Sequence, residues 1–183
     1  MCPVQFSRLA EPLMTRAVLH GDGSPSATLH FMGQARPAVI GASGIRPVKV
    51  EGDHGTPVGV LPLRQVFYRA DRTARPITTL PLEPLSPTDG WCDDQSDANY
   101  NRFVALPYPA GHERLWRDDH VYDLVVVLGH NDAPPVPGRG SAIFLHLPPA
   151  DGRPTEGCIA VPEAVLRDLL RDGLTEIEVL PPA

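Results

Sequence analysis

One cysteine follows a glycine in a setting that favours a reactive thiol. Cys158 lies in the segment Thr155-Glu156-Gly157-Cys158-Ile159, and His146 precedes it by twelve positions, at the end of an apolar stretch. A thiol needs a nearby base to act as a nucleophile at neutral pH, and histidine is the usual partner. Gly157 allows a sharp backbone turn, so that amide groups can point at a developing oxyanion. These residues predict a cysteine nucleophile with a histidine base; the alternative is an inert buried cysteine and a structural histidine.

The other two cysteines are weaker candidates for a nucleophile. Cys92 is followed by Asp93 and Asp94, and neighbouring carboxylates raise the pKa of a thiol. Cys2 lies close to the N-terminus and has no informative neighbours. Because three cysteines are an odd number, at least one of them is outside any intrachain disulfide.

A metal site is the main competing hypothesis. The residues that could ligate zinc are seven histidines and three other side chains: His20, His30, His54, His112, His120, His130, His146, Asp118, Asp119 and Cys158. Their spacing matches neither His-Glu-x-x-His nor Cys-x-x-Cys, the spacings of common zinc sites. We therefore expect no metal and no cofactor, since a thiol, an imidazole and backbone amides can supply every catalytic role.

Short strands separated by proline and glycine must position these groups. The chain has 183 residues, of which 22 are Pro and 16 are Gly, and both residues interrupt regular structure. Apolar and β-branched residues cluster into candidate strands at 14–20, 27–32, 38–40, 60–68, 121–129, 141–147 and 175–180. The stretch 121–129 is the most apolar, so we expect a central strand buried on both faces.

One helix is predicted near the C-terminus. Pro162 can occupy its first position and Gly173 can end it. The apolar stripe between them has helical spacing: Val165, Leu166, Leu169 and Leu170. Residues 69–90 form a long proline-rich loop. Together these features predict a single α+β domain that is mostly β, a curved sheet or β-sandwich with one docked helix, over residues 1–183 with its core at about 25–180.

Charge and hydropathy narrow the classes of partner. The formal net charge is -6 at pH 7, whereas nucleic-acid binding requires a basic surface, so we expect no nucleic-acid partner. No apolar run approaches the roughly 20 residues that span a bilayer, so we expect no membrane span. Residues 1–8 show no recognisable export signal.

Four ordered segments resemble one bacterial family, the L,D-transpeptidase catalytic domain, also called the YkuD domain. That family carries a histidine on a strand followed by a Ser/Thr-His-Gly-Cys signature, to which His146 and Thr155-Glu156-Gly157-Cys158 correspond. Residues 52–59, GDHGTPVG, are similar to its Thr-Pro-x-Gly segment. Residues 89–101 and 129–131 resemble a compact branch found mainly in Gram-negative bacteria.

The resemblance implies a peptidoglycan L,D-transpeptidase. Cys158 would attack the carbonyl of a donor stem peptide, and His146 would take the thiol proton and return it to the leaving amine. An acceptor amine from a second stem would resolve the thioester into a cross-link, of the 3→3 or 1→3 type. The carbonyl of Leu147 would orient the imidazole, and the amides of Gly157 and Cys158 would hold the oxyanion.

Two alternatives remain open on the same scaffold. Water in place of the acceptor amine would give an L,D-carboxypeptidase or a related hydrolase. A non-catalytic cell-wall-binding module would keep the fold and use the thiol only for packing. The implied function points to the periplasm, whereas the absence of a recognisable export signal points the other way. The resemblance also implies a covalent carbapenem adduct on the cysteine, and we expect a monomer.

Glu156 departs from the family pattern, because it occupies the position of the second histidine. A carboxylate that points inward would raise the thiol pKa, so we expect Glu156 at the mouth of the cleft, where it could hold the acceptor ammonium; a solvated loop carboxylate is the alternative. The other candidates for substrate contact are His130, Asn131, Arg153, Arg102, Arg139, Trp91 and Tyr68. Each also has a structural alternative, as a turn residue, a surface charge or a core aromatic.

Overall fold

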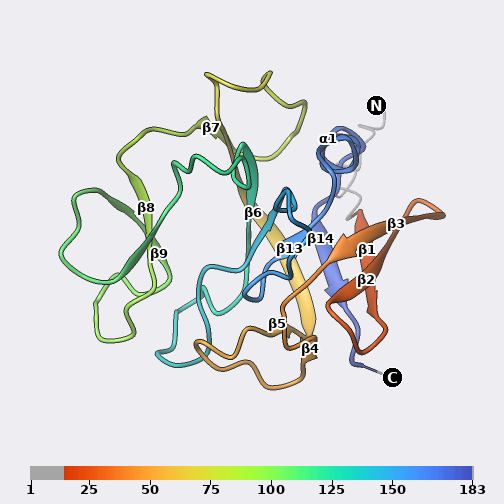
Figure 1. Cartoon of the computed structure of the whole chain (residues 1–183), viewed down its shortest axis with the longest axis horizontal. Coiled ribbons are helices and arrows are strands. Elements are labelled where there is room, and N and C mark those ends of the chain that lie inside the picture. The colour runs from red at the N-terminus through yellow and green to blue at the C-terminus, as the bar shows by residue number, and fades with distance from the viewer. Residues whose placement is uncertain (1–14, 183) are drawn as a thin grey trace, which may run out of the picture.

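The computed structural model describes residues 15–182, and its elements are drawn in Figure 1. The strands are β1 (Arg16–Gly21), β2 (Ser26–Phe31), β3 (Gln34–Val39), β4 (Ile45–Arg46), β5 (Thr56–Pro57), β6 (Gly59–Tyr68), β7 (Leu82–Pro84), β8 (Asp89–Cys92), β9 (Arg102–Ala105), β10 (His112–Arg114), β11 (Leu124–Leu128), β12 (Phe144–His146), β13 (Ile159–Ala160) and β14 (Glu176–Val179). The helix α1 (Glu163–Arg171) lies between β13 and β14. Each predicted strand has a counterpart in the structure, although Met14, the first residue of the predicted strand 14–20, lies outside the described residues. Cys2 lies outside them as well.

The large sheet curves until it closes on itself. It has nine strands in the order β11-β12-β13-β3-β2-β1-β14-β6-β7, and β11 pairs with β6 as well as with β12. β7 extends from this closed circuit along the C-terminal end of β6. Closure leaves few unpaired edges, which short strands of this kind otherwise expose. The prediction of a mostly β fold with a curved sheet and one helix is confirmed.

Strand β11 separates two apolar cores. Leu124, Val126 and Leu128 belong to the first core, which includes the side chains from β1, β2, β14 and α1. Val125 and Val127 belong to the second core. Because successive side chains of a strand point to opposite faces, β11 is buried on both sides, as its composition predicts.

The neighbouring strand β12 alternates in the same way and thereby directs the candidate base. Leu145 packs in the first core, and Phe144 packs in the second. His146 lies two residues after Phe144, so it shares the face of the second core. Cys158 also belongs to the second core. The fold therefore brings both candidate catalytic residues to the same side of the large sheet.

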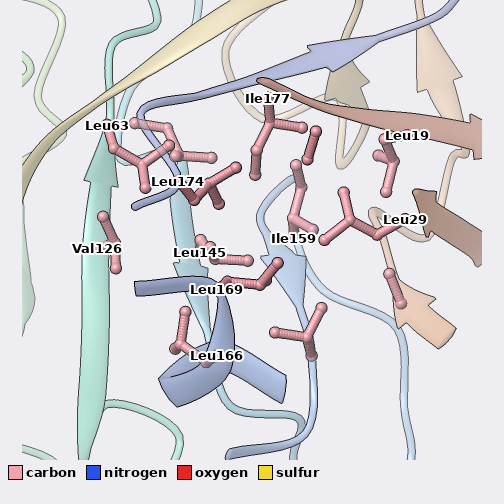
Figure 2. Packing of buried hydrophobic residues seen from close by; sticks show 14 of the residues in the cluster. Leu19, Leu29, Leu63, Val126, Leu145, Ile159, Leu166, Leu169, Leu174 and Ile177 are labelled. Atoms are coloured by element: carbon pink, nitrogen blue, oxygen red, sulfur yellow. The ribbon is translucent and has the colours of Figure 1, made fainter. Parts of the chain in front are cut away.

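Helix α1 packs on the first core. Leu166, Leu169 and Leu170 are buried, and Figure 2 shows Leu166 and Leu169 pointing from the helix toward Leu145. Burial of three leucines contributes about 1.5 to 3 kcal/mol each, which anchors the helix far more strongly than its short length could.

Both ends of α1 follow from the sequence. Pro162 stands at the N-cap, so the helix begins one residue later than predicted. At the other end Gly173 adopts φ of 81°, and its N–H donates to the carbonyl of Leu170. The N–H of Leu174 donates to the carbonyl of Leu169, which completes the hydrogen-bond pair typical of a glycine-terminated helix.

A smaller sheet covers the second core, and no sequence pattern predicted it. Its order is β10-β8-β9, and Figure 1 shows β8 and β9 at the end of the molecule opposite β1 to β3. Trp91 of β8 packs edge-on against Phe144, with ring centroids 5.3 Å apart. Among residues 15–182, no helix is long and apolar enough to cross a membrane.

Candidate active site

The Cys158 thiol is buried and is held by two backbone groups. Its residue is 8% exposed, the N–H of Phe144 donates to Sγ at 3.3 Å, and Sγ donates to the carbonyl of Ala142 at 3.2 Å. Burial raises the pKa of this thiol to about 12, and the nearby Glu113 carboxylate adds to the rise. At neutral pH Cys158 is therefore a protonated thiol.

The His146 ring is fixed in one tautomer. Its Nδ1 lies 2.7 Å from the carbonyl oxygen of Leu147, the contact that the resemblance implies. Because a carbonyl can only accept, Nδ1 donates its proton and Nε2 keeps a lone pair. Burial lowers the pKa of His146 to about 4, against the opposing effect of the Leu147 hydrogen bond. The ring packs edge-on against Tyr122, with centroids 5.3 Å apart. A neutral imidazole with a free Nε2 can accept a proton.

Cys158 and His146 line the same cavity, whose volume is about 530 Å³. This volume is in the range of sites for small ligands. Arg153 and Glu156 also line the cavity, and both are exposed. The structure thus brings together four of the side chains that the sequence nominated. Glu156 lies where a carboxylate can meet solvent and substrate rather than the protein interior.

The segment that carries the thiol is fastened by two threonines. Thr56, from the Thr-Pro segment, donates through Oγ1 to the carbonyl of Gly157 at 2.9 Å. Thr155 donates through Oγ1 to the carbonyl of Cys158 at 2.6 Å and accepts from the Gly157 N–H at 3.3 Å. None of the hydrogen bonds found among residues 15–182 uses the N–H of Cys158. That amide is therefore the better prepared of the two donors that the resemblance implies for an oxyanion.

Gly157 should not tolerate a side chain. It adopts φ of 130°, and a Cβ there would lie 2.9 Å from the carbonyl oxygen of Gly55. We expect Gly157→Ala to lower the free energy of unfolding by about 2 to 3 kcal/mol. Gly152→Ala is the matched control, because Gly152 also has positive φ (69°) but nothing within 4 Å of its Cβ position. If urea unfolding showed the same loss of unfolding free energy in the two variants, the close approach of Gly55 to Gly157 would not be what excludes a side chain there.

Two of the nominated residues, His130 and Asn131, organise a loop and do not line the cavity. His130 Nε2 is 2.8 Å from the carbonyl of Arg139. Asn131 donates to the carbonyls of Val136 and Gly140 and accepts from the Val136 N–H. These contacts match the turn alternative, and Arg139 contributes its backbone carbonyl to the same loop.

The remaining nominated residues lie elsewhere in the fold. Trp91 and Arg102 line a second cavity, of about 400 Å³. Tyr68 is buried in the first core. Cys92 is fully buried, and burial followed by the Asp97 and Asp93 carboxylates raises its thiol pKa, as its acidic neighbours predict. Because the pKa of Cys158 is raised as well, the two thiols are distinguished by position: Cys158 lines the cavity with His146, and Cys92 does not. Within residues 15–182, no three His, Cys, Asp or Glu side chains are grouped so that they could hold a metal ion.

Sequence reasoning missed several charged residues of the cavity that Cys158 and His146 line: Lys49, Glu51, Asp93, Glu113 and Arg117. Glu113 is the most informative, since burial raises its pKa and the Tyr122 hydroxyl donates to it at 2.6 Å. Lys49 and Glu51 stand immediately before the glycine-rich 52–59 segment, so that segment could have indicated them. Glu113 lies in the unpredicted strand β10, and no local signal indicated it.

In this closed, mostly β fold a thiol and an imidazole line one cavity, and these are the two side-chain types that cysteine acyl transfer uses. The family model of the L,D-transpeptidase catalytic domain (YkuD) matches residues 19–174. The chain belongs to this family. Comparisons with curated proteins and with solved structures give no match.

Proposed function

We propose that this protein is a peptidoglycan L,D-transpeptidase that joins stem peptides through a thioester on Cys158. The observation that supports this function most directly is the shared cavity of Cys158 and His146, with both side chains held by backbone groups. Family membership supports peptidoglycan peptides as the substrate class. Since that substrate lies outside the cytoplasm, we propose the periplasm as the site of action.

The neutral state of both groups defines the first chemical step. His146 Nε2 takes the thiol proton as Sγ bonds to the donor carbonyl carbon, because a free thiolate is costly in this buried position. The N–H of Cys158 stabilises the resulting oxyanion, together with that of Gly157. Collapse of the tetrahedral intermediate breaks the amide bond to the terminal D-residue, and His146 returns its proton to the leaving amine.

The second step uses the same groups in the same order. An acceptor amine attacks the thioester carbonyl, and His146 takes a proton from that amine. The C–S bond breaks, the thiol regains its proton, and an amide cross-link remains. Water in place of the amine would leave a shortened stem and a free carboxylate instead.

The most direct test is incubation of the purified protein with purified muropeptides, followed by mass analysis. Cross-linked dimers would support the transpeptidase, whereas shortened monomers alone would identify a carboxypeptidase. Unchanged muropeptides would favour the binding module and overturn the proposal. Product analysis is more decisive than thiol labelling, because a buried protonated thiol reacts slowly with simple alkylating agents even in an active enzyme.

Glu156 is proposed to hold the acceptor ammonium at the cavity mouth. Its side chain is exposed and lines the cavity. We therefore expect Glu156→Gln to form the thioester at nearly the wild-type rate but to shift products from cross-links toward hydrolysis, because a charge-assisted hydrogen bond to the amine is lost. Intact-protein mass after carbapenem addition measures the thioester, and muropeptide analysis measures the ratio. Equal ratios in both proteins would leave Glu156 as a solvated loop residue.

A further inference from the structure

Asn101 uses all of its hydrogen-bonding capacity at one buried point. It is 5% exposed, and its Oδ1 accepts from the Trp91 Nε1–H and from the Ala142 N–H, both at 3.0 Å. Its Nδ2 donates to the carbonyls of His130 at 2.9 Å and Asn131 at 2.8 Å. A side-chain amide has two donors and an oxygen with two lone pairs, so no capacity is left. The amide joins β8, the turn after β11, and the segment before β12.

The preceding residue reinforces one of these connections. The Tyr100 hydroxyl donates to Oε2 of Glu51, and the Ser141 hydroxyl donates to the same oxygen at 2.8 Å. The dipeptide Tyr100-Asn101 therefore holds the dipeptide Ser141-Ala142 by two separate routes. Ala142 adopts φ of 51°, a conformation that non-glycine residues rarely adopt without support from their surroundings.

The supported segment is the one that holds the thiol. The carbonyl of Ala142 accepts a hydrogen bond from the Cys158 thiol, and the N–H of Phe144, two residues later, donates a hydrogen bond to the same sulfur. Asn101 does not touch the sulfur itself. It accepts a hydrogen bond from the N–H of Ala142, the residue whose carbonyl contacts the sulfur.

We propose that Asn101 is a positioning residue for Cys158: by holding the Ala142 N–H, it fixes the carbonyl to which the thiol donates and so holds the sulfur in place in the cavity. The catalytic use of that thiol rests on the proposed function. The positioning itself does not, because it can be measured on the free thiol.

The proposal predicts two effects of opposite sign. An S–H that donates to a carbonyl is stabilised in its neutral form, so loss of the fixed carbonyl makes the thiol ionise more readily. Alkylation of Cys158 by iodoacetamide at pH 8 should then become about two- to tenfold faster, the equivalent of one hydrogen bond. Acylation by a carbapenem should become about tenfold slower or more, because the sulfur is no longer held for attack.

Two substitutions of Asn101 separate positioning from simple loosening. Asn101→Gly removes the amide, and glycine accepts the φ of 57° without strain. Asn101→Asp keeps an oxygen for the Ala142 N–H but loses the donors to the two turn carbonyls, and any negative charge opposes thiol ionisation. We expect faster alkylation in the glycine variant and no acceleration in the aspartate variant. Asn99→Asp is the control, since Asn99 is exposed on the same loop.

Two controls accompany the alkylation rates: peptide mass analysis identifies the cysteine that is alkylated, and thermal unfolding shows that each variant is folded. Equal alkylation rates in wild type and Asn101→Gly, or equal acceleration in both variants, would overturn the proposal. If Asn101→Gly does not fold, Asn101→Ser replaces it, and failure of both would show that Asn101 serves the fold alone. A wild-type protein that neither reacts with carbapenem nor changes muropeptides would refute the proposed function, while the alkylation comparison would still test the positioning.

Discussion

Cys158→Ala is expected to reduce thioester formation to background and to abolish cross-linking, because no other thiol among residues 15–182 lines the cavity. The substitution also leaves the Phe144 N–H and the Ala142 carbonyl without the sulfur they contact, which costs about 1 to 3 kcal/mol of stability. Cys158→Ser puts a hydroxyl in place of the thiol, so it can still hydrogen-bond to the Phe144 N–H and the Ala142 carbonyl but lacks the sulfur nucleophile. This variant therefore separates the loss of the nucleophile from the loss of these contacts. Intact-protein mass with a carbapenem and muropeptide analysis measure both variants.

The matched control for the nucleophile is Cys92→Ala. Cys92 is fully buried in β8 and does not line the cavity of Cys158 and His146, so this variant should keep most of the activity and lose only some stability. If the Cys92 variant were inactive and the Cys158 variant active, the assignment of Cys158 as the nucleophile would be wrong.

The parts of the fold that the sequence predicts are those with a strong local pattern. The apolar run that becomes β11 has hydrophobic side chains on both faces, so it is stable when both faces are buried. The leucines of α1 lie on one face of the helix, so that face is buried. The candidate status of Cys158 and His146, which line one cavity in the structure, also came from local signals, because Gly157 marks a sharp turn and β12 ends at His146. These are properties of a few neighbouring residues.

The parts that escaped prediction depend on contacts between distant segments. Strands β8, β9 and β10 have three or four residues each and no clear alternation, so their pairing decides their structure. The register that sets Glu113 opposite Trp91 is what carries this carboxylate to the cavity. Asn101 is similar: its type suggests a turn, and only the assembled fold gives it four partners.

The neutrality of the catalytic pair links this burial to the mechanism. Burial removes water from both groups, which raises the thiol pKa and lowers the imidazole pKa. A pair poised as thiolate and imidazolium would be the opposite arrangement. In the proposed mechanism His146 accepts the proton during the attack, so we expect the base to matter more here than in a site with a preformed thiolate.

His146→Ala is accordingly expected to slow acylation of Cys158 by a factor on the order of 10² to 10⁴, the usual contribution of a positioned general base. His130→Ala should give a smaller loss, because His130 holds a loop carbonyl and does not line the cavity. Stopped-flow or quenched mass measurements with a carbapenem report the rates. A His146 variant that acylates at the wild-type rate would remove this residue from the mechanism.

The pH dependence tests the same assignment in the unmodified protein. With a pKa of about 4, His146 remains a neutral base down to that pH, so the acylation rate should be level from about pH 5 to 8 and should fall as pH drops through 4. The unfolded chain binds this proton at ordinary histidine pKa, so the same shift reduces stability as pH falls below about 6.5. Circular dichroism at each pH must therefore show folded protein. An acid limb near 6.5 in folded protein, or one that persists in His146→Ala, would contradict the proposal that the buried imidazole is the base.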